Sequence, residues 1–254
     1  MTPTAPTDLE LLVLAADIAD RESMRTWRSD DLEVEIKADG SPVSATDKLI
    51  ERLLRELLAA HRPDVRVLGE EEGDTGTGAR CWVLDPIDGT KSYVAGGRAW
   101  GSLIALEVNG QPVAGMVSMP AFGRRWWGTL DGGAFMTDEP GATPRSIHAS
   151  TESDASQMRW SSNPIFDQLE HEERERIARY EGLGRHVPLD EWTTYPPLMV
   201  ADGTLELAVQ FGQHWDHAAL AAVVVAAGGQ TTYDPHPADG RRFACTFTNG
   251  HVDL

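Results

Sequence analysis

The sequence predicts a mixed α/β fold, with an antiparallel, helix-flanked first half and a second half in which helices and strands alternate. Near the start, apolar residues recur at helical spacing. Two apolar runs then flank Asn109-Gly110, the dipeptide that two-residue hairpin turns prefer. Towards the end, an Ala/Val-rich stretch stops at Gly228-Gly229, as a helix with a C-terminal glycine does. This order of elements indicates stacked layers of helix and sheet.

The first half is predicted to hold two helices followed by a series of strands. Thr7-Asp8-Leu9-Glu10 has the form of a capping box, and the helix after it is expected to run to about Trp27. A second helix spans roughly 46–61, with its leucines facing inward. The apolar strand at 81–84 is expected to end at Asp85. The remaining strands of this half are predicted at 32–36, 65–68, 100–108, 112–119 and 124–130.

The second half is expected to begin in the stretch from Asp138 to Pro144, which is rich in turn residues. This boundary divides the chain into 1–143 and 144–254, and 254 residues suit one large domain or two coupled half-domains. Helices are predicted at 169–180, 196–201 and 216–227, and strands at 205–210 and near positions 230 and 243.

Composition excludes several classes of partner. The chain has 40 acidic against 22 basic residues and a net charge of −18, so its surface repels nucleic acids and anionic membranes. A small anionic substrate stays open, because a bound divalent cation reverses the local field. The two cysteines are far apart and lack metal-ligand spacing. The start does not resemble a signal peptide, and the longest apolar stretch is too short to span a bilayer, so we expect a cytoplasmic protein.

The most informative segment is Asp85-Pro86-Ile87-Asp88-Gly89-Thr90, where two carboxylates follow a buried strand three residues apart. An ordinary Asp-Pro turn would have the same form. The ends of such a turn lie within about 7 Å, however, and paired metals in hydrolytic sites lie about 3.5–4 Å apart. Oxygen ligands select hard cations, so Mg²⁺ is expected first and Mn²⁺ second. The amides of Gly89 and Thr90 are placed to hold a phosphate oxygen.

Other acids are candidates for the same site, although each has a simpler explanation. Glu70 lies in an acidic loop, Asp216 opens the Ala/Val-rich helix, and Asp47 completes a capping box with Ser44. The functional interpretation places Asp47 beside Thr90, where the pair orients a water molecule. The acid spacing does not match an EF-hand or the Asp-x-Asp-Gly-Thr loop of haloacid dehalogenase-type phosphatases, which disfavours an aspartyl-phosphate mechanism.

Together these segments resemble the inositol monophosphatase family of lithium-sensitive, metal-dependent phosphatases. The resemblance rests on four ordered motifs, which lie at 37–47, 69–71, 85–90 and 215–216, with 226–229 after the last. It implies a layered αβαβα sandwich of the inositol monophosphatase and sugar phosphatase type. It also implies hydrolysis of a small phosphate monoester, two or three Mg²⁺ per site, inhibition by Li⁺ and a homodimer.

The resemblance also assigns roles to residues of this chain. Asp47 and Thr90 would position the attacking water, and the amides of Gly89 and Thr90 would hold the phosphate. Lys37 would lie on a loop over the site. The groups that would bind metal are Glu70, Asp85, the carbonyl of Ile87, Asp88 and Asp216, of which Glu70 also has a catalytic role and Asp216 also contacts substrate.

Within the family, the segments 88–94 and 120–127 resemble actinobacterial-type histidinol-phosphate phosphatases, enzymes of histidine biosynthesis. That substrate carries an ammonium and an imidazole, which Asp190 in the atypical segment 189–197 would suit. Gln210 stands nearest to a glutamate that the family often carries before its Trp-Asp pair. The alternatives are inositol 1-phosphate, 3′-phosphoadenosine 5′-phosphate, and a non-catalytic metal-dependent phospholigand sensor. An intact Asp47–Thr90 pair disfavours the sensor.

Overall fold

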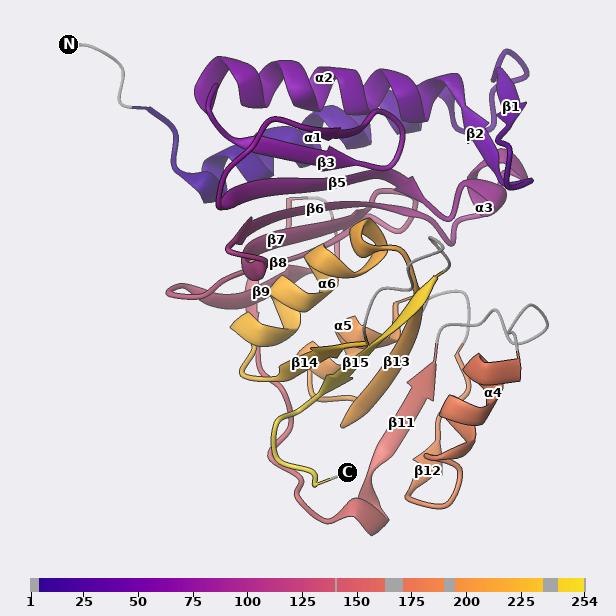
Figure 1. The fold of residues 1–254 in the computed structure, drawn as a ribbon, viewed down its shortest axis with the longest axis vertical. Helices are drawn as coiled ribbons and strands as arrows, with labels where there is room; N and C mark the ends of the chain where they lie inside the picture. The colour runs from indigo at the N-terminus through magenta and orange to yellow at the C-terminus, as the bar shows by residue number, and fades with distance from the viewer. Residues whose placement is uncertain (1–4, 140, 163–170, 190–194, 235–241, 254) are drawn as a thin grey trace.

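The computed structural model describes residues 5–139, 141–162, 171–189, 195–234 and 242–253. Its elements form five layers of alternating helix and sheet (Figure 1), so the predicted layered α/β fold is confirmed. α1 and α2 cover one face of a large sheet, and α5 and α6 lie between its other face and a smaller sheet, with α4 outermost. The helices are α1 (Asp8–Thr26), α2 (Ala45–His61), α3 (Thr90–Val94), α4 (His171–Ala178), α5 (Pro196–Ala201) and α6 (His214–Ala226), with a 3₁₀ turn at Ala155–Gln157.

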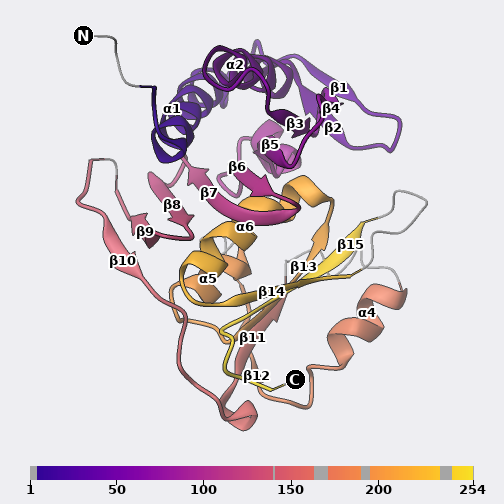
Figure 2. The same cartoon turned by 60° about the vertical axis from the view of Figure 1, so that its left-hand side comes forward.

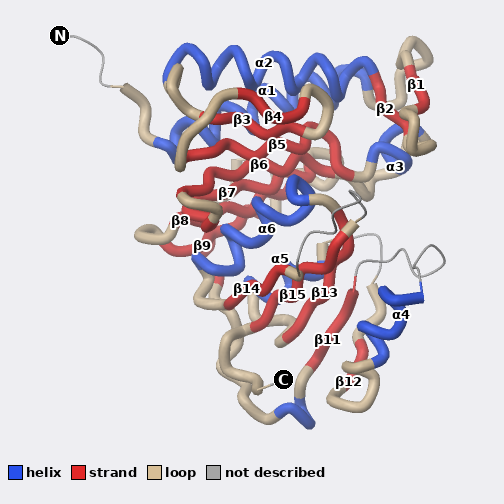
Figure 3. The backbone as a smooth tube through the Cα atoms, in the orientation of Figure 1, coloured by secondary structure: helices blue, strands red, loops and turns tan. Residues whose placement is uncertain are grey.

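The large sheet has eight strands in the order β10-β9-β8-β7-β6-β5-β3-β4. Its strands pair antiparallel except for β3 with β5 (Figure 3). The hairpin predicted at Asn109-Gly110 is confirmed, and both residues have the positive φ that its tight turn requires. The strands are β3 (Arg66–Gly69), β4 (Gly73–Thr75), β5 (Arg80–Asp88), β6 (Gly101–Val108), β7 (Gln111–Met119), β8 (Arg124–Thr129), β9 (Gly133–Thr137) and β10 (Arg145–Ile147).

The smaller sheet has five strands in the order β12-β11-β13-β15-β14, of mixed direction. A separate two-stranded hairpin, β1 with β2, carries the loop that begins at Lys37. The remaining strands are β1 (Val34–Ile36), β2 (Pro42–Ser44), β11 (Arg159–Ser162), β12 (Arg185–His186), β13 (Leu207–Gly212), β14 (Gln230–Tyr233) and β15 (Phe243–Thr248).

Both N-terminal helices begin at the capping boxes that the sequence predicts. Thr7 caps α1 together with Glu10, and Ser44 caps α2 together with Asp47. Their apolar faces pack on one side of the large sheet, where Trp82 of β5 is fully buried. The predicted helices and most predicted strands therefore lie within a few residues of their observed positions.

α6 packs on the other face of the large sheet (Figure 2), and two glycines of the sheet permit a close approach of the backbones. A Cβ at Gly115 of β7 would lie 2.6 Å from the Cβ of Ala222, and one at Gly128 of β8 would lie 2.5 Å from the Cβ of Ala226. Pairing glycine on the sheet with alanine on the helix brings the two backbones together. The N-terminus of α6 is thereby held against the end of β5 that carries the aspartates.

The predicted end of the strand before Asp85 is wrong, because β5 continues to Asp88. Asp85 pairs with Leu103 and Asp88 with Gly101, so the register shifts by one residue between them. Proline has no N–H to donate to a ladder, which explains why the irregularity falls at Pro86. The two acids are therefore joined by a β-bulge within a strand, whereas the sequence predicted a turn after one.

Two further observations concern membrane spans and the two tryptophans of β8. Within the described residues, the structure contains no helix with both the length and the apolar character needed to cross a membrane. Trp126 is buried in the core between the large sheet and α6, whereas Trp127 points to the opposite face and stacks on Phe135 at a centroid distance of 5.9 Å.

Candidate active site

The alternation of β5 brings two of the predicted metal ligands to the α6 side of the large sheet. Trp82 and Leu84 face α1 and α2, while Cys81 and Val83 belong to the core beneath α6. Asp85 continues the second set and is buried. The bulge then turns Asp88 towards the same side, where both carboxylates meet Asp216.

Asp216 comes from the first turn of α6, and its local contacts fix its direction. Its Oδ2 accepts the backbone N–H of Gln213 at 2.6 Å, which closes a capping box. A Cβ at Gly212 would lie 2.2 Å from the same Oδ2, so glycine is required where β13 enters the helix. The carboxylates of Asp85, Asp88 and Asp216 each offer an oxygen within 4.8 Å of the others.

Glu70 approaches these aspartates from the turn after β3. Its backbone N–H donates to the carbonyl of Leu84 at 3.2 Å, which ties the turn to β5. The ammonium of Lys37 lies 2.7 Å from Glu70 Oε1 and 2.8 Å from Glu71 Oε1. Lys37 thus reaches over from the β1–β2 hairpin, and burial of Glu71 raises the pKa of that carboxyl to about 7 although Lys37 opposes the shift.

The electrostatics of the cluster fit a hard cation. Burial raises the pKa of Asp88 to about 6, and burial together with neighbouring carboxylates raises the pKa values of Asp85 and Asp216 well above their ordinary range. Both carboxylate oxygens of Asp85 are buried and have no hydrogen-bond partner among the described groups. A divalent cation would satisfy these oxygens and neutralise the repulsion, and an all-oxygen donor set favours Mg²⁺ or Mn²⁺.

Asp47 and Thr90 lie beside the cluster. Asp47 Oδ2 accepts the backbone N–H of Ser44 at 2.8 Å and its hydroxyl at 2.5 Å, which leaves Oδ1 facing Thr90. The Thr90 hydroxyl lies 3.4 Å from that Oδ1 and 2.9 Å from the carbonyl oxygen of Ile87. Burial raises the pKa of Asp47 to about 6, despite the hydrogen bonds from Ser44.

Gly89 shapes the junction between β5 and α3. It has a φ of 82°, and a Cβ there would lie 2.7 Å from the carbonyl oxygen of Ala99. Only glycine fits both constraints. The Gly89 carbonyl accepts the N–H groups of Ser92 at 2.8 Å and Tyr93 at 3.1 Å, so this residue starts α3 directly after Asp88.

The predicted substrate-binding residues are placed only in part. Asp190 lies outside the described residues. The Gln210 side chain points to the start of α6, where its Nε2 donates to the backbone carbonyl of Asp216 at 3.3 Å. The neighbouring histidines do not join the acidic cluster. His214 lies 3.0 Å from Glu107, and burial lowers the pKa of His217 to about 3.

Two residues near the site were not assigned there from the sequence. Tyr195 lies in the atypical segment 189–197, in which only Asp190 was assigned a role from the sequence. It is buried next to the aspartates, and its hydroxyl forms no hydrogen bond of normal geometry with the described residues. Its proximity lowers the pKa of Asp88 and so partly offsets the effect of burial on that carboxyl. Glu51 is a fully buried acid that contacts the turn carrying Glu70. Its only sequence signal is a position one helical turn after Asp47, on the apolar face of α2.

Comparison with known proteins agrees with this architecture. The sequence profile of the inositol monophosphatase family matches residues 7–249. A histidinol-phosphatase of Streptomyces coelicolor is 42% identical, covering 89% of this chain and 86% of the relative. One from Mycobacterium tuberculosis is 35% identical, covering 96% of this chain and 94% of the relative. The structure of an inositol monophosphatase from Zymomonas mobilis has a TM-score of 0.72 at 27% identity and covers 96% of this chain and 93% of that one. The chain therefore belongs to the inositol monophosphatase family.

Proposed function

We propose that the chain is a Mg²⁺-dependent histidinol-phosphatase, which hydrolyses histidinol phosphate to histidinol and inorganic phosphate. The chemistry is supported by one arrangement, in which the cluster of Asp85, Asp88 and Asp216 lies beside the Asp47–Thr90 pair. The substrate is supported by the two histidinol-phosphatases that are 42% and 35% identical to this chain. The proposal assigns the chain to histidine biosynthesis, and its cytoplasmic location stays a prediction.

In the proposed reaction, Asp47 and Thr90 orient the attacking water. Ser44 occupies one carboxylate oxygen of Asp47, so the other is directed at Thr90 and at a water bound between them. The Thr90 hydroxyl donates its hydrogen to the Ile87 carbonyl and can accept one from the water. The water oxygen then bonds to phosphorus while one water proton passes to Asp47, the phosphorus–ester oxygen bond breaks, and the released alkoxide takes up a proton from solvent.

The cation would be held by Glu70, Asp85, Asp88, Asp216 and the carbonyl of Ile87, with two or three ions per site. Bound there, Mg²⁺ supplies the positive charge that stabilises the phosphoryl oxygens and the leaving oxygen. This contribution is needed because positioning of the water by itself accounts for at most about 7–11 kcal/mol of the barrier. Support by Mn²⁺ and inhibition by Li⁺ are further parts of the proposal.

Gln210 is our candidate for contact with the histidinol part of the substrate, together with Asp190. Its side chain is buried, and its Oε1 has no hydrogen-bond partner in the described part of the chain. A carbonyl oxygen in this state would accept a hydrogen bond from an ammonium or imidazole N–H.

The deciding experiment measures phosphate release from histidinol phosphate, myo-inositol 1-phosphate and 3′-phosphoadenosine 5′-phosphate, each with Mg²⁺ and with EDTA. We expect Mg²⁺-dependent release with a clear preference for histidinol phosphate in kcat/KM. Preference for another ester would keep the chemistry and overturn the substrate. Failure to release phosphate from all three, with Mg²⁺ still bound, would favour the sensor.

Family membership also supports a homodimer. Trp127 and Phe135 form a half-buried stacked pair on the face of the large sheet that α1 and α2 cover elsewhere. Light scattering on the purified protein is expected to give twice the 27.7 kDa mass of the chain. A monomer mass at micromolar concentration would contradict this part of the proposal.

A further inference from the structure

Glu51 is an acidic side chain in a place where burial is costly. It is 0% exposed, on the face of α2 that packs towards the large sheet, one turn after Asp47. A carboxylate removed from water needs hydrogen bonds and an opposite charge to offset its desolvation. The groups that donate hydrogen bonds to Glu51, or carry the opposite charge, therefore show which part of the chain this carboxylate holds in place.

Two of these groups are backbone amides of the turn that carries Glu70. The N–H of Glu71 donates to Glu51 Oε2 at 2.8 Å, and the N–H of Glu72 donates to Oε1 at 3.0 Å. The N–H of Glu70 is bonded to the Leu84 carbonyl of β5. Three consecutive amides are therefore fixed, one by the sheet and two by a single carboxylate of α2.

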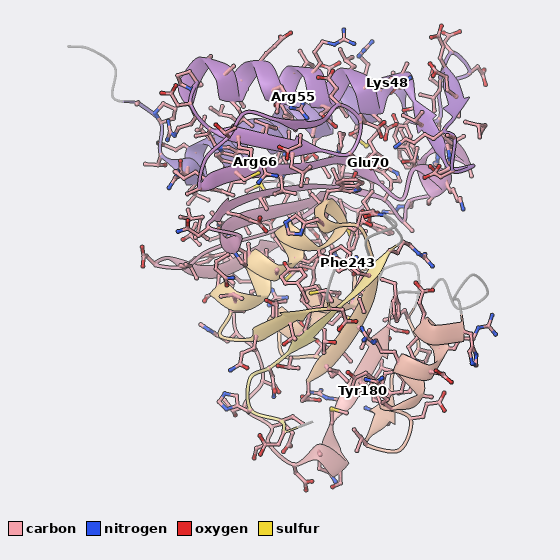
Figure 4. All side chains as sticks on the ribbon, in the orientation of Figure 1. Lys48, Arg55, Arg66, Glu70, Tyr180 and Phe243 are labelled. Carbon is pink, nitrogen blue, oxygen red and sulfur yellow. The ribbon has the colours of Figure 1, made fainter. Side chains whose placement is uncertain are left out.

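Arg55 supplies the opposite charge and extends the same contact. Its guanidinium lies 2.7 Å from Glu51 Oε1 and is itself only 12% exposed. It also donates to the carbonyl oxygen of Gly73 at 2.5 Å and to the Thr75 hydroxyl at 2.7 Å. Figure 4 labels Arg55 on α2 and Glu70 at the end of the strands below it. Glu51 and Arg55 thus form hydrogen bonds with the chain from the Glu70 turn into β4.

Gly69, immediately before the turn, has no side chain that would displace the Glu51 carboxylate. A Cβ at Gly69 would lie 2.1 Å from Glu51 Oε1 and 2.4 Å from its carboxyl carbon. Gly69 has no positive φ, so its backbone does not require glycine. The requirement is space, and the occupant of that space is the Glu51 carboxylate.

We propose that Glu51 is a positioning residue that sets the direction of the Glu70 side chain for cation binding. The inference rests on the proposed metal-dependent function. Glu51 reaches Glu70 only through the backbone of the turn, so it is not itself a ligand. Because Asp47 and Glu51 lie on one helix, α2 also holds the water-orienting carboxylate and the Glu70 turn at a fixed separation.

The test is Glu51→Gln, which keeps the size of the side chain but replaces one acceptor oxygen with an NH₂ group. That group would face a backbone N–H, so one of the two bonds to the turn must break. We expect Mn²⁺ binding, measured by calorimetry without substrate, to weaken about 10–100-fold, as loss of an outer partner of a metal ligand typically does. The Mg²⁺ concentration for half-maximal activity should rise by a similar factor, while kcat at saturating Mg²⁺ falls much less.

Two further variants make the result decisive. Glu56→Gln changes an exposed acid on the same helix and should leave Mn²⁺ binding unchanged. Gly69→Ala keeps the Glu51 charge but pushes its carboxylate away from the turn, so it should weaken Mn²⁺ binding in the same direction. If Glu51→Gln does not fold, Gly69→Ala decides by the same measurement.

Wild-type Mn²⁺ affinity in folded Glu51→Gln or in Gly69→Ala, with melting temperature as the check on folding, would overturn the inference. A purely structural role would lower the melting temperature and leave Mn²⁺ affinity unchanged. The outcome is separable from that of the proposed function, because Mn²⁺ binding is measured without a phosphate ester. A wild-type chain that binds Mn²⁺ but releases no phosphate would refute the enzyme and leave this test intact.

Discussion

The Thr90 hydroxyl lies 3.4 Å from Asp47 Oδ1, although the two residues are 43 positions apart in the chain. Asp47 is fixed by the capping box of α2 and Thr90 by the start of α3, so neither side chain depends on a flexible loop. The distance is short enough for one water molecule to contact both groups. The first prediction follows from this pair.

Thr90→Ala should lower kcat by about 10²-fold, the loss typical of a misplaced reacting group, with little change in KM. The reason is loss of the hydroxyl that orients the water, while the metal ligands stay in place. Steady-state phosphate release measures the effect. Thr90→Ser keeps the hydroxyl and serves as the control, so equal losses in both variants would contradict the assigned role.

Asp88→Asn should abolish turnover and leave the fold intact. It removes one charge from a partly buried cluster of acids that repel one another, so the variant in EDTA should melt at the same temperature as the wild type or higher. Circular dichroism and phosphate release together measure this. Asp131→Asn, at an exposed turn, should match the wild type in both. An Asp88→Asn protein with most of its activity would refute the assignment.

Addition of Mg²⁺ to the chelated wild-type protein should raise its melting temperature, because the ion binds the folded state and not the unfolded chain. At 100 times the dissociation constant, the expected stabilisation is about 2.7 kcal/mol. The increase should be much smaller in Asp88→Asn, which lacks one of the converging carboxylates. An equal increase in both proteins would indicate that Mg²⁺ binds elsewhere.

Tyr195→Phe tests the buried hydroxyl near Asp88, which lowers the pKa of that carboxyl. Without it, the pKa of Asp88 should rise further, because burial is then opposed by fewer groups, and Mg²⁺ must compete with a more tightly bound proton. Near pH 6, we expect the Mg²⁺ concentration for half-maximal activity to rise several-fold in the variant. At pH 8 the difference from the wild type should be smaller. A shift of the same size at both values would exclude this explanation.

Gly128→Ala tests the close packing of α6 on β8. The added Cβ would lie 2.5 Å from that of Ala226, and overpacking of this kind typically costs about 1–3 kcal/mol. Urea unfolding measures the loss. Gly182→Ala is the matched control, because no atom lies within 4 Å of a Cβ there and its φ is not positive. Equal stability of the two variants would show that α6 can move without cost.

Local signals in the sequence were enough to predict most elements of the fold. Capping boxes at Thr7 and Ser44, the Asn109-Gly110 turn and the glycine after α6 each depend only on neighbouring residues. The continuation of β5 beyond Asp85 depends on its partner β6, which resumes pairing at Gly101 after the bulge. No local pattern specifies that partner, so the end of the strand was predicted wrongly.

In the candidate site, too, residues in local motifs were predicted, whereas residues placed by tertiary contacts were not. The acids that the structure brings together lie in motifs that the sequence singled out, and family resemblance supplied their grouping. Glu51 carried no such signal, because an acid on a helix is normally exposed. Its burial arises only when the turn of Glu70 folds back over α2. Tyr195 was likewise not assigned to the site, because its approach to Asp88 depends on how the chain leads into α5.

The cluster draws its carboxylates from two layers: Asp85 and Asp88 belong to the large sheet, and Asp216 belongs to the helix layer beneath it. An ion shared among them would therefore connect two layers that otherwise meet mainly through apolar side chains and through the contact between His214 and Glu107. Backbone amides in β5 and at the start of α6 should then exchange their hydrogens more slowly when the ion is bound, and both segments should change together. Removal of the ion by chelation, or substitution of an aspartate in either layer, would therefore loosen the packing of the two layers against each other.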